Sequence, residues 1–197
     1  MQPHTFILVG RSGSGKGTQL ELLQKYLQEK DSAASQKSLV MGEIYRAFFK
    51  EAGYVQDIAR DVSMKQGKFQ PDFLTNALFI SNAVHNVDGT SHLFVDGYPR
   101  TVDQLLVTQT FLEYVKRENP IFLNIEVSKE EVKKRMLLRG RGDDSDSAID
   151  SRLAEYDRTV VPMLEAVKGN PFFKLMNING EQSVEGVHND IIAALGI

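Results

Sequence analysis

A glycine-rich segment near the N-terminus constrains the fold of this chain more than any other stretch. Residues 10–18 read GRSGSGKGT and keep the spacing Gly-x-x-x-x-Gly-Lys from Gly10 to Lys16. Residues 5–9 (TFILV) are mostly apolar or β-branched, which predicts a buried strand. Residues 19–27 carry apolar side chains at helical spacing. A strand, a glycine-rich turn and a helix in this order form the context that a phosphate-binding loop needs.

The chemistry of this loop favours phosphate groups. Glycines let several backbone N–H groups converge without Cβ clashes, and the first helical turn adds unpaired N–H groups and the positive end of its dipole. Lys16 supplies a charge for the outer phosphates. A turn that merely joins strand to helix is the alternative, but four glycines plus a lysine at this spacing favour phosphate binding. Gly17 follows the lysine and the hydroxyl comes only at Thr18, which leaves metal ligation by the loop in doubt.

The composition bounds the class of protein. A length of 197 residues suggests one domain with small inserted lobes. A net charge of −3 gives no support for a broad surface that binds nucleic acid or anionic membranes. The chain has no cysteine, so disulfides, a thiol nucleophile and a Cys-based zinc site are excluded. Since no apolar run reaches membrane-spanning length and no signal-peptide pattern opens the sequence, we expect a soluble cytoplasmic protein.

Strand and helix patterns alternate along the rest of the chain, after a polar loop at 29–37. Further strands are expected at 38–41, 91–96, 120–127 and 172–177. Helices are expected at 42–50, 55–66, 71–85, from beyond 101 to about 117, from a capping-box pattern at 128–131 to about 138, at 147–167 and at 183–195. Pro162 should kink or divide the helix at 147–167.

This alternation predicts a fold of the P-loop NTPase type. Mostly apolar strands between helices argue for a five-stranded parallel sheet covered on both faces, in a three-layer α/β/α arrangement. The helical stretch between the second and third strands is too long for a simple crossover. We therefore expect it to form a small inserted lobe.

Charged residues gather where these strands are expected to end. In such sheets ligands bind beyond the carboxyl ends of the strands, which brings together the glycine loop, residues 96–100 and the charged segment after 127. Arginines from these segments could converge on the same phosphates, although solvated surface charge is the usual fate of arginine: Arg100, Arg135, Arg139, Arg141 and Arg152.

The acids and histidines near these segments have more than one interpretation. Asp96 either forms a hydrogen-bonded turn or orients a magnesium ion through the water shell of that ion. Asp143 and Asp144 either pair with arginines or cap the helix that follows. The four histidines are scattered among ordinary positions, and we assign no chemistry to His4, His85, His92 or His188.

Three motifs resemble those of the nucleoside monophosphate kinases, and of the adenylate kinase family in particular. They are GKGTQ at 15–19, DGYPRT at 96–101, and RGDD at 141–144 with Arg152 beyond it. The resemblance spans nearly the whole chain, keeps the motif order and accounts for Gly17, where the family normally has glycine. It implies a core of residues 1–40, 87–138 and 148–197, an insertion at about 41–86 that binds the monophosphate, and a short lid at about 139–147.

The resemblance also implies an activity and residues that carry it. The activity is reversible, magnesium-dependent transfer of a phosphoryl group from ATP to AMP, giving two ADP, for adenine nucleotide homeostasis. Residues implied to bind ATP are Gly13, Ser14, Gly15, Lys16, Gly17, Thr18, Arg135, Arg139 and Gln182. Residues implied to bind AMP are Met41, Gly42, Arg46, Lys68, Phe69, Gln70, Gly97, Arg100, Gln104, Arg141 and Arg152.

Within these sets the resemblance implies separate roles. Arg46 and Arg100 would grip the AMP phosphate, Gln104 would bond the AMP base, and Arg135 would stack on the ATP base. The catalytic set would be Lys16, Arg100, Arg139, Arg141 and Arg152, with Asp96 holding Mg²⁺ through water. Mobile lobes would exclude water from the reaction. The family further implies a monomer with no structural zinc and no nucleic-acid or membrane partner.

The sequence departs from the family pattern at several positions. Ser12 stands where proline is usual, Gln182 appears where a glycine is usual, residues 31–37 make a longer connection, and the lid at 139–147 is shorter even than the usual short form. Met41 stands where adenylate kinases have a threonine that helps to recognise adenine and where uridylate/cytidylate kinases tend to have alanine. A kinase for UMP or CMP therefore stays an alternative. A non-catalytic nucleotide switch would need no acceptor site, and the spacing of Arg46, Arg100 and Gln104 counts against it.

Overall fold

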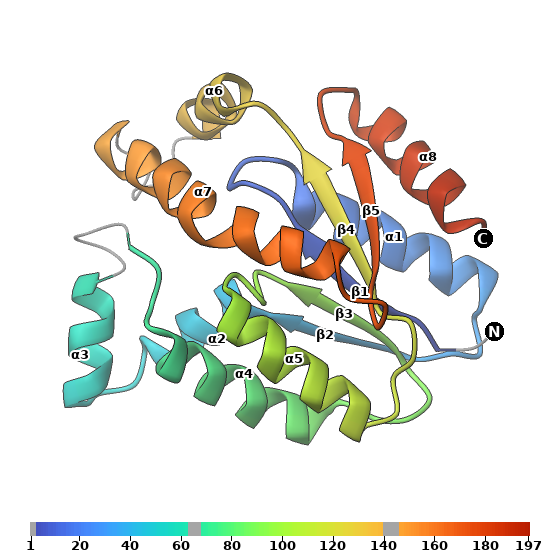
Figure 1. The fold of residues 1–197 in the computed structure, drawn as a ribbon, viewed down its shortest axis with the longest axis horizontal. Coiled ribbons are helices and arrows are strands. Elements are labelled where there is room, and N and C mark those ends of the chain that lie inside the picture. Colours follow the sequence, from blue (N-terminus) through green and yellow to red (C-terminus); the bar gives the residue numbers. More distant parts are fainter. Residues whose placement is uncertain (1–2, 63–67, 140–145) are drawn as a thin grey trace.

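A five-stranded parallel sheet forms the centre of the computed structural model, which describes residues 3–62, 68–139 and 146–197. The strands lie in the order β2-β3-β1-β4-β5 (Figure 1). They are β1 (Thr5–Val9), β2 (Gln36–Val40), β3 (His92–Asp96), β4 (Ile121–Glu126) and β5 (Lys174–Asn179). The prediction of five parallel strands is confirmed, and β1 has the bounds that its sequence pattern indicates.

Helices cover both faces of this sheet. Successive side chains of a strand point to opposite faces, so Phe6 and Leu8 of β1 enter one core and Ile7 and Val9 enter the other. The first core packs against α1 (Lys16–Lys30), α6 (Lys129–Arg139) and α8 (Val184–Leu195). The second packs against α4 (Asp72–Asn86), α5 (Val102–Tyr114) and most of α7 (Asp146–Lys168). The predicted three-layer α/β/α fold is therefore confirmed.

Among the described residues between β2 and β3 there are three helices. They are α2 (Met41–Phe48), α3 (Tyr54–Arg60) and α4. Figure 1 shows α3 standing away from the sheet, while α4 runs beneath it beside α5. The Arg60 side chain fastens α3 to the end of α2, since its Nη1 donates a hydrogen bond to the Phe49 carbonyl over 2.6 Å. That residues 41–86 act as a separate lobe stays a prediction.

Some boundaries differ from those that the sequence patterns predict. Gln36 and Lys37 belong to β2 rather than to a loop, because β2 is the edge strand of the sheet, pairs with β3 and tolerates polar side chains. Strand β5 begins at Lys174, two residues after the expected start at 172. Helix α7 runs undivided from Asp146 to Lys168 through Pro162. Val160 and Met163 beside this proline are almost fully buried, so packing holds the helix where a backbone bond is lost.

A buried polar cluster lies at the end of the sheet opposite the glycine loop. His92 is fully buried, its Nδ1 accepts a hydrogen bond from the His4 backbone N–H over 3.1 Å, and its Nε2 lies 3.6 Å from Asp31 Oδ2. Arg117 is also buried and donates to the Asp88 carbonyl over 2.5 Å. Burial lowers the pKa of both His92 and His4 below the ordinary histidine value, and the positive charge of Arg117 acts on His92 in the same direction.

In the part of the chain that the structure describes, no helix has the length and apolar character needed to cross a membrane.

This cluster makes the stability of the fold depend on pH. The unfolded chain binds a proton at His92 near the ordinary pKa of about 6.5, whereas the folded chain resists that proton. We therefore expect the free energy of unfolding to be highest above about pH 6.5 and to fall as the pH drops toward the lowered pKa, because protons bind the unfolded state more tightly. His4 contributes in the same direction, and the carboxylate of Asp31 opposes part of the effect.

Urea unfolding between pH 5 and pH 8 checks this prediction. His92→Gln should flatten the dependence, because glutamine carries no titrating group. The control is His85→Gln, which replaces an exposed histidine on α4 and should leave the dependence as it is. An equal slope in wild type and His92→Gln would contradict the assignment to this cluster.

Candidate functional site

Residues 10–18, the phosphate loop from here on, lie between β1 and α1 in a conformation that needs glycine. Gly10 has a φ of 149°, and a Cβ there would lie 2.7 Å from the Ile125 carbonyl oxygen. Gly13 has a φ of 86°, and a Cβ there would lie 3.0 Å from Met136 Cγ on α6. A Cβ at Gly15 or Gly17 would meet no atom within 4 Å. One side of the loop is thus packed against β4 and α6, while the side at Gly15 and Gly17 is open.

Lys16 is the first residue of α1 and lies across the loop backbone. Its Nζ donates to the carbonyl oxygens of Gly10 over 2.8 Å and Arg11 over 3.0 Å. The ammonium group and the N-terminus of α1, with its partial positive charge, therefore both lie at the phosphate loop. Together they can bind an anion with several oxygens, such as a polyphosphate.

The strand register sets an acid beside this loop. In the parallel pairing of β1 with β3, Asp96 is aligned with Leu8, one residue before the end of β1. Oδ1 of Asp96 is buried, and none of the described residues donates a hydrogen bond to it. A hydrated Mg²⁺ ion fits such a carboxylate, because the ion keeps several waters when it binds beside phosphates. Within residues 3–62, 68–139 and 146–197, no group of three or more His, Cys, Asp or Glu residues could hold a metal.

The turn after β3 carries Arg100 close to Asp96. Arg100 Nε donates to the Gly97 carbonyl over 2.9 Å, and its guanidinium lies 4.4 Å above the centre of the Phe69 ring. Burial lowers the pKa of Arg100, Asp96 opposes this shift, and the positive charge of Arg152 on α7 adds to it. Arg100 and Arg152 thus lie within electrostatic reach of one another, as suits a site for an anion with more than one charge.

A hydrogen-bond network joins the Arg100 turn to α4. Gln104 Oε1 accepts from the Arg100 backbone N–H over 2.8 Å, and Gln104 Nε2 donates to Asp72 Oδ1 over 2.7 Å. Thr101 Oγ1 donates to Asp72 Oδ2 over 2.8 Å and accepts from the Gln104 backbone N–H over 3.1 Å. Gln104 is only 3% exposed, so its amide group is engaged inside the protein on both atoms. A base could hydrogen-bond to this amide only by replacing one of these partners.

Tyr98, for which the sequence predicts no role, joins the same turn to α4. Tyr98 stacks on Phe79 of α4 with ring centroids 3.8 Å apart, and its hydroxyl donates to Asn76 Oδ1 over 2.8 Å. Burial raises the pKa of Tyr98, so its hydroxyl stays neutral. Asp72 was missed as well. An acid in the first turn of a helix is expected from the helix dipole alone, so the sequence gives no sign that Asp72 bonds to Thr101 and Gln104.

The other residues expected to bind the acceptor come from α2 and the segment after α3. Met41 is fully buried in the core, so its side chain is not on the protein surface. Arg46 Nη1 lies 3.3 Å from the position that a Cβ would take at Gly42. Gln70 is buried, and its Nε2 donates to the Ala59 carbonyl over 2.7 Å, while Lys68 is exposed. Within the segment 68–70, Phe69 contacts Arg100 through the face of its ring.

The residues expected at the donor base lie between α6 and the connection from β5 to α8. Arg135 donates to Glu131 Oε1 over 2.8 Å and to the Gly180 carbonyl over 3.2 Å. Gln182 Nε2 donates to the Asn179 carbonyl over 3.0 Å and to Asp190 Oδ2 over 2.6 Å. The structure thus brings Arg135 and Gln182 to the same connection. Arg141, Asp143, Asp144 and the side chain of Arg139 lie outside the described residues.

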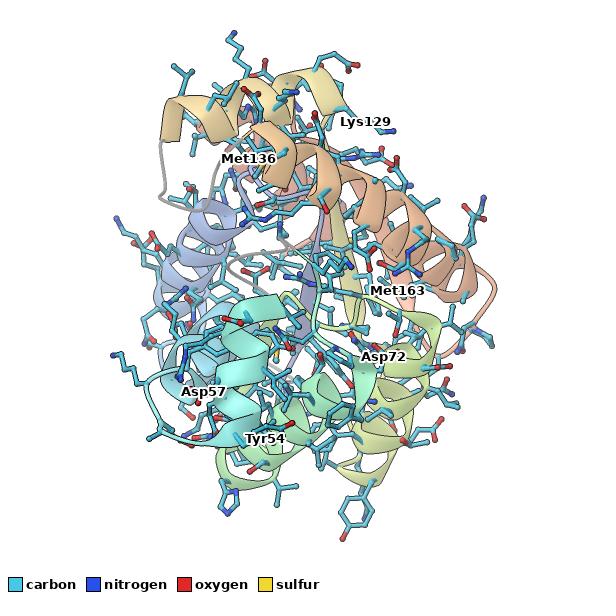
Figure 2. All side chains as sticks on the ribbon, turned by 90° about the vertical axis from the view of Figure 1, so that its left-hand side faces the viewer. Tyr54, Asp57, Asp72, Lys129, Met136 and Met163 are labelled. Carbon is cyan, nitrogen blue, oxygen red and sulfur yellow. The ribbon has the colours of Figure 1, made fainter. Side chains whose placement is uncertain are left out.

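These groups come from opposite sides of the strand ends. Figure 2 looks toward the carboxyl ends of the strands, with α6 and its labelled Lys129 and Met136 on one side. The labelled Asp72 of α4, and Tyr54 and Asp57 of α3, lie on the other side. The glycine-rich loop with Lys16 therefore lies between a helix that carries Arg135 and a turn that carries Arg100.

Comparison with known proteins gives a consistent result. The model of the family described as adenylate kinase matches residues 8–170. An adenylate kinase of Corynebacterium urealyticum is 30% identical over 189 residues, which cover 96% of this chain and 97% of that protein. Adenylate kinase 1 of a Nostoc species is 30% identical over 190 residues, covering 96% and 97% of the two chains. An adenylate kinase of Ureaplasma urealyticum is 29% identical over 211 residues, covering 94% and 95%.

The Asp72 network predicts a specific loss of stability. Asp72→Ala would leave the buried Gln104 Nε2 without its acceptor, so we expect the free energy of unfolding to fall by about 1–3 kcal/mol. Asp103→Ala is the matched control, since Asp103 is an exposed acid in the first turn of the neighbouring helix α5. Its loss should reflect only the helix dipole, at about 0.3–1 kcal/mol. Equal losses for the two variants in urea unfolding would contradict the network.

Proposed function

We propose that this chain, which belongs to the adenylate kinase family, transfers a phosphoryl group reversibly from magnesium-bound ATP to AMP and so produces two ADP. Membership of the family makes it a phosphotransferase of the nucleoside monophosphate kinase class, which binds nucleotides. One observation carries the finer proposal. The phosphate loop at the end of β1 and the Arg100 turn at the end of β3 follow two hydrogen-bonded neighbouring strands. Two phosphate-binding groups are therefore presented side by side.

This arrangement suits phosphoryl transfer. The reaction needs alignment of the two nucleotides and neutralisation of charge rather than covalent help from the protein. We assign the outer phosphates of ATP to the backbone of residues 13–18 and to Lys16. We assign the phosphate of AMP to Arg100 and Arg46. Arg152, together with Arg139 and Arg141 from the proposed lid, would neutralise charge on the group in transfer.

The donor base and the metal are assigned on separate observations. Arg135 bonds to the connection from β5 to α8, which also carries Gln182, and this supports a place for the ATP base there. Asp96, with its buried Oδ1, would hold Mg²⁺ through water. The metal, when bound, neutralises phosphate charge. Closure of residues 41–86 and 139–147 over the nucleotides would exclude water.

Two observations argue against recognition of adenine by Met41 or Gln104. Met41 is fully buried and offers no hydroxyl, and the Gln104 amide is already bonded to Arg100 and Asp72. Neither residue is therefore set to recognise adenine in this conformation. A UMP or CMP kinase is the second candidate function.

An acceptor panel tests the proposal. The purified chain is given ATP and Mg²⁺ with AMP, UMP, CMP or GMP in turn, and ADP release is followed in a coupled assay. We expect AMP to be the fastest acceptor and removal of Mg²⁺ with a chelator to stop turnover. A clear preference for a pyrimidine monophosphate would overturn the choice of AMP. ATP binding without transfer to any acceptor would instead indicate a nucleotide switch.

Two substitutions probe the two phosphate sites. Lys16→Met and Arg100→Ala should each lower turnover by about a hundredfold or more, since each removes a positively charged side chain that we assign to a phosphate group. The first should raise KM mainly for ATP and the second mainly for the monophosphate. Lys25→Met, which changes an exposed lysine on the same helix as Lys16, is the control and should keep normal turnover. Circular dichroism checks the fold, and near-normal turnover in a folded Lys16→Met or Arg100→Ala variant would refute the assigned role.

A further inference from the structure

Arg11 belongs to the phosphate loop, but its side chain extends from the loop to the end of β4 and to α7. Its Nη1 donates to the Val127 carbonyl just after β4 over 3.1 Å, and its Nη2 donates to Asp157 Oδ1 on α7 over 2.9 Å. The guanidinium carbon also lies 4.8 Å from the centre of the Tyr156 ring. Arg11 therefore joins the loop to segments that are 116 and 146 residues away in sequence.

The partners of Arg11 form a small charged cluster. Asp157 Oδ2 lies 2.5 Å from Lys129 Nζ, at the first residue of α6. Lys129 and then Arg11 lower the pKa of Asp157, so its carboxylate stays ionised between the two cations. Burial raises the pKa of Tyr156 to about 12, so the ring beneath Arg11 stays neutral. The cluster holds α6, α7 and the phosphate loop together (Lys129 is labelled in Figure 2).

The backbone of Arg11 contacts the residue that we assign to ATP. The Arg11 carbonyl accepts a hydrogen bond from Lys16 Nζ over 3.0 Å. On the other side of the cluster, Asp157 lies five residues after Arg152 on α7, about 7.5 Å along the helix axis. Arg11 thus connects Lys16 to the helix that carries Arg152, through its carbonyl oxygen on one side and its guanidinium on the other.

Directed polar contacts and the Tyr156 ring hold the Arg11 side chain beside an open space. A cavity of about 720 Å³ lies beside it, and Arg11 and Tyr156 are both part of its lining. On the side of this space no packing by the described residues holds the guanidinium, so its bonds to Val127 and Asp157 and its ring contact with Tyr156 fix its position. Replacement of the guanidinium would therefore release the loop from α7 instead of letting neighbouring atoms fill the gap.

We propose that Arg11 is a positioning residue, which fixes the phosphate loop against α7 through Asp157 so that Lys16 and Arg152 meet the same nucleotide in register. It acts through these partners and does not itself touch the phosphates. The proposal rests on the proposed function, because it assigns Lys16 and Arg152 to ATP and the group in transfer. It goes beyond that function by giving a role to a loop position that phosphate binding leaves unexplained.

A double-mutant cycle tests this role. Arg11→Ala should weaken ATP binding and lower kcat/KM for ATP by about tenfold, with KM for the monophosphate within about twofold. Asp157→Asn should act in the same way, and the double variant should be no worse than the more damaging single variant, because both changes break one connection. Arg11→Lys should recover part of the loss, since lysine can pair with Asp157 but cannot reproduce the two-ended guanidinium contact.

The matched control removes an ion pair from the same helix without touching the loop. Arg158 pairs with Glu155 over 2.5 Å on the surface of α7, so Arg158→Ala should leave ATP affinity and kinetics unchanged. Thermal melts of all variants show whether each is folded at the assay temperature. A lower melting temperature in Arg11→Ala with unchanged ATP affinity and kinetics would show that Arg11 only stabilises the fold and would contradict the positioning role. Losses that multiply in the double variant would show that Arg11 acts independently of Asp157.

Equilibrium binding of ATP in the absence of any acceptor separates this proposal from the proposed function. If the wild-type chain binds ATP but transfers to no acceptor, the proposed function fails. The affinities of the Arg11 and Asp157 variants then still decide the positioning role, with an unchanged affinity in Arg11→Ala contradicting it. A wild-type chain that binds no ATP contradicts both.

Discussion

The parallel pairing of β1 with a strand on each side is the constraint on which the rest of the structure depends. All five residues of β1 are buried, and their backbone groups are bonded to β3 on one side and β4 on the other. The end of β1 is therefore fixed relative to the ends of its neighbours. Since the phosphate loop begins at that end, Asp96 and the Arg100 turn from β3 and the Val127 carbonyl after β4 all lie at defined positions beside it.

The two halves of the candidate site are held by different kinds of contact. On the side of the phosphate loop, ionic and backbone contacts join Arg11 to α7 and Lys16 to the loop carbonyls. On the side of the Arg100 turn, neutral and carboxylate hydrogen bonds join Gln104 and Thr101 to Asp72. Because ion pairs are screened by salt and buried hydrogen bonds much less so, the first side depends more on ionic strength than the second.

The sequence predicts the parts of this structure that local patterns specify. The strand at 5–9, the glycine loop and the alternation of strands and helices follow from apolar spacing and glycine positions over short windows. The polar start of β2 could not be predicted in this way, because its strand conformation comes from pairing with β3. The partners of Arg11 and the network of Asp72 likewise depend on contacts between residues distant in sequence. In the local sequence, Arg11 reads as a surface cation and Asp72 as an acid at a helix start. Gln104 could be singled out from the motif, but not its internal bonds to Arg100 and Asp72.

The internal bonds of Gln104 have a consequence for how a monophosphate kinase of this construction chooses its acceptor. A base that uses the Gln104 amide must first displace the carboxylate of Asp72 or the N–H of Arg100, so recognition is an exchange of partners. Only the difference between the bonds gained and lost contributes to selectivity. Acceptor choice would then be adjustable through Asp72 on α4, without any change in Gln104. Specificity could in this way change while the residues assigned to the phosphates stay the same.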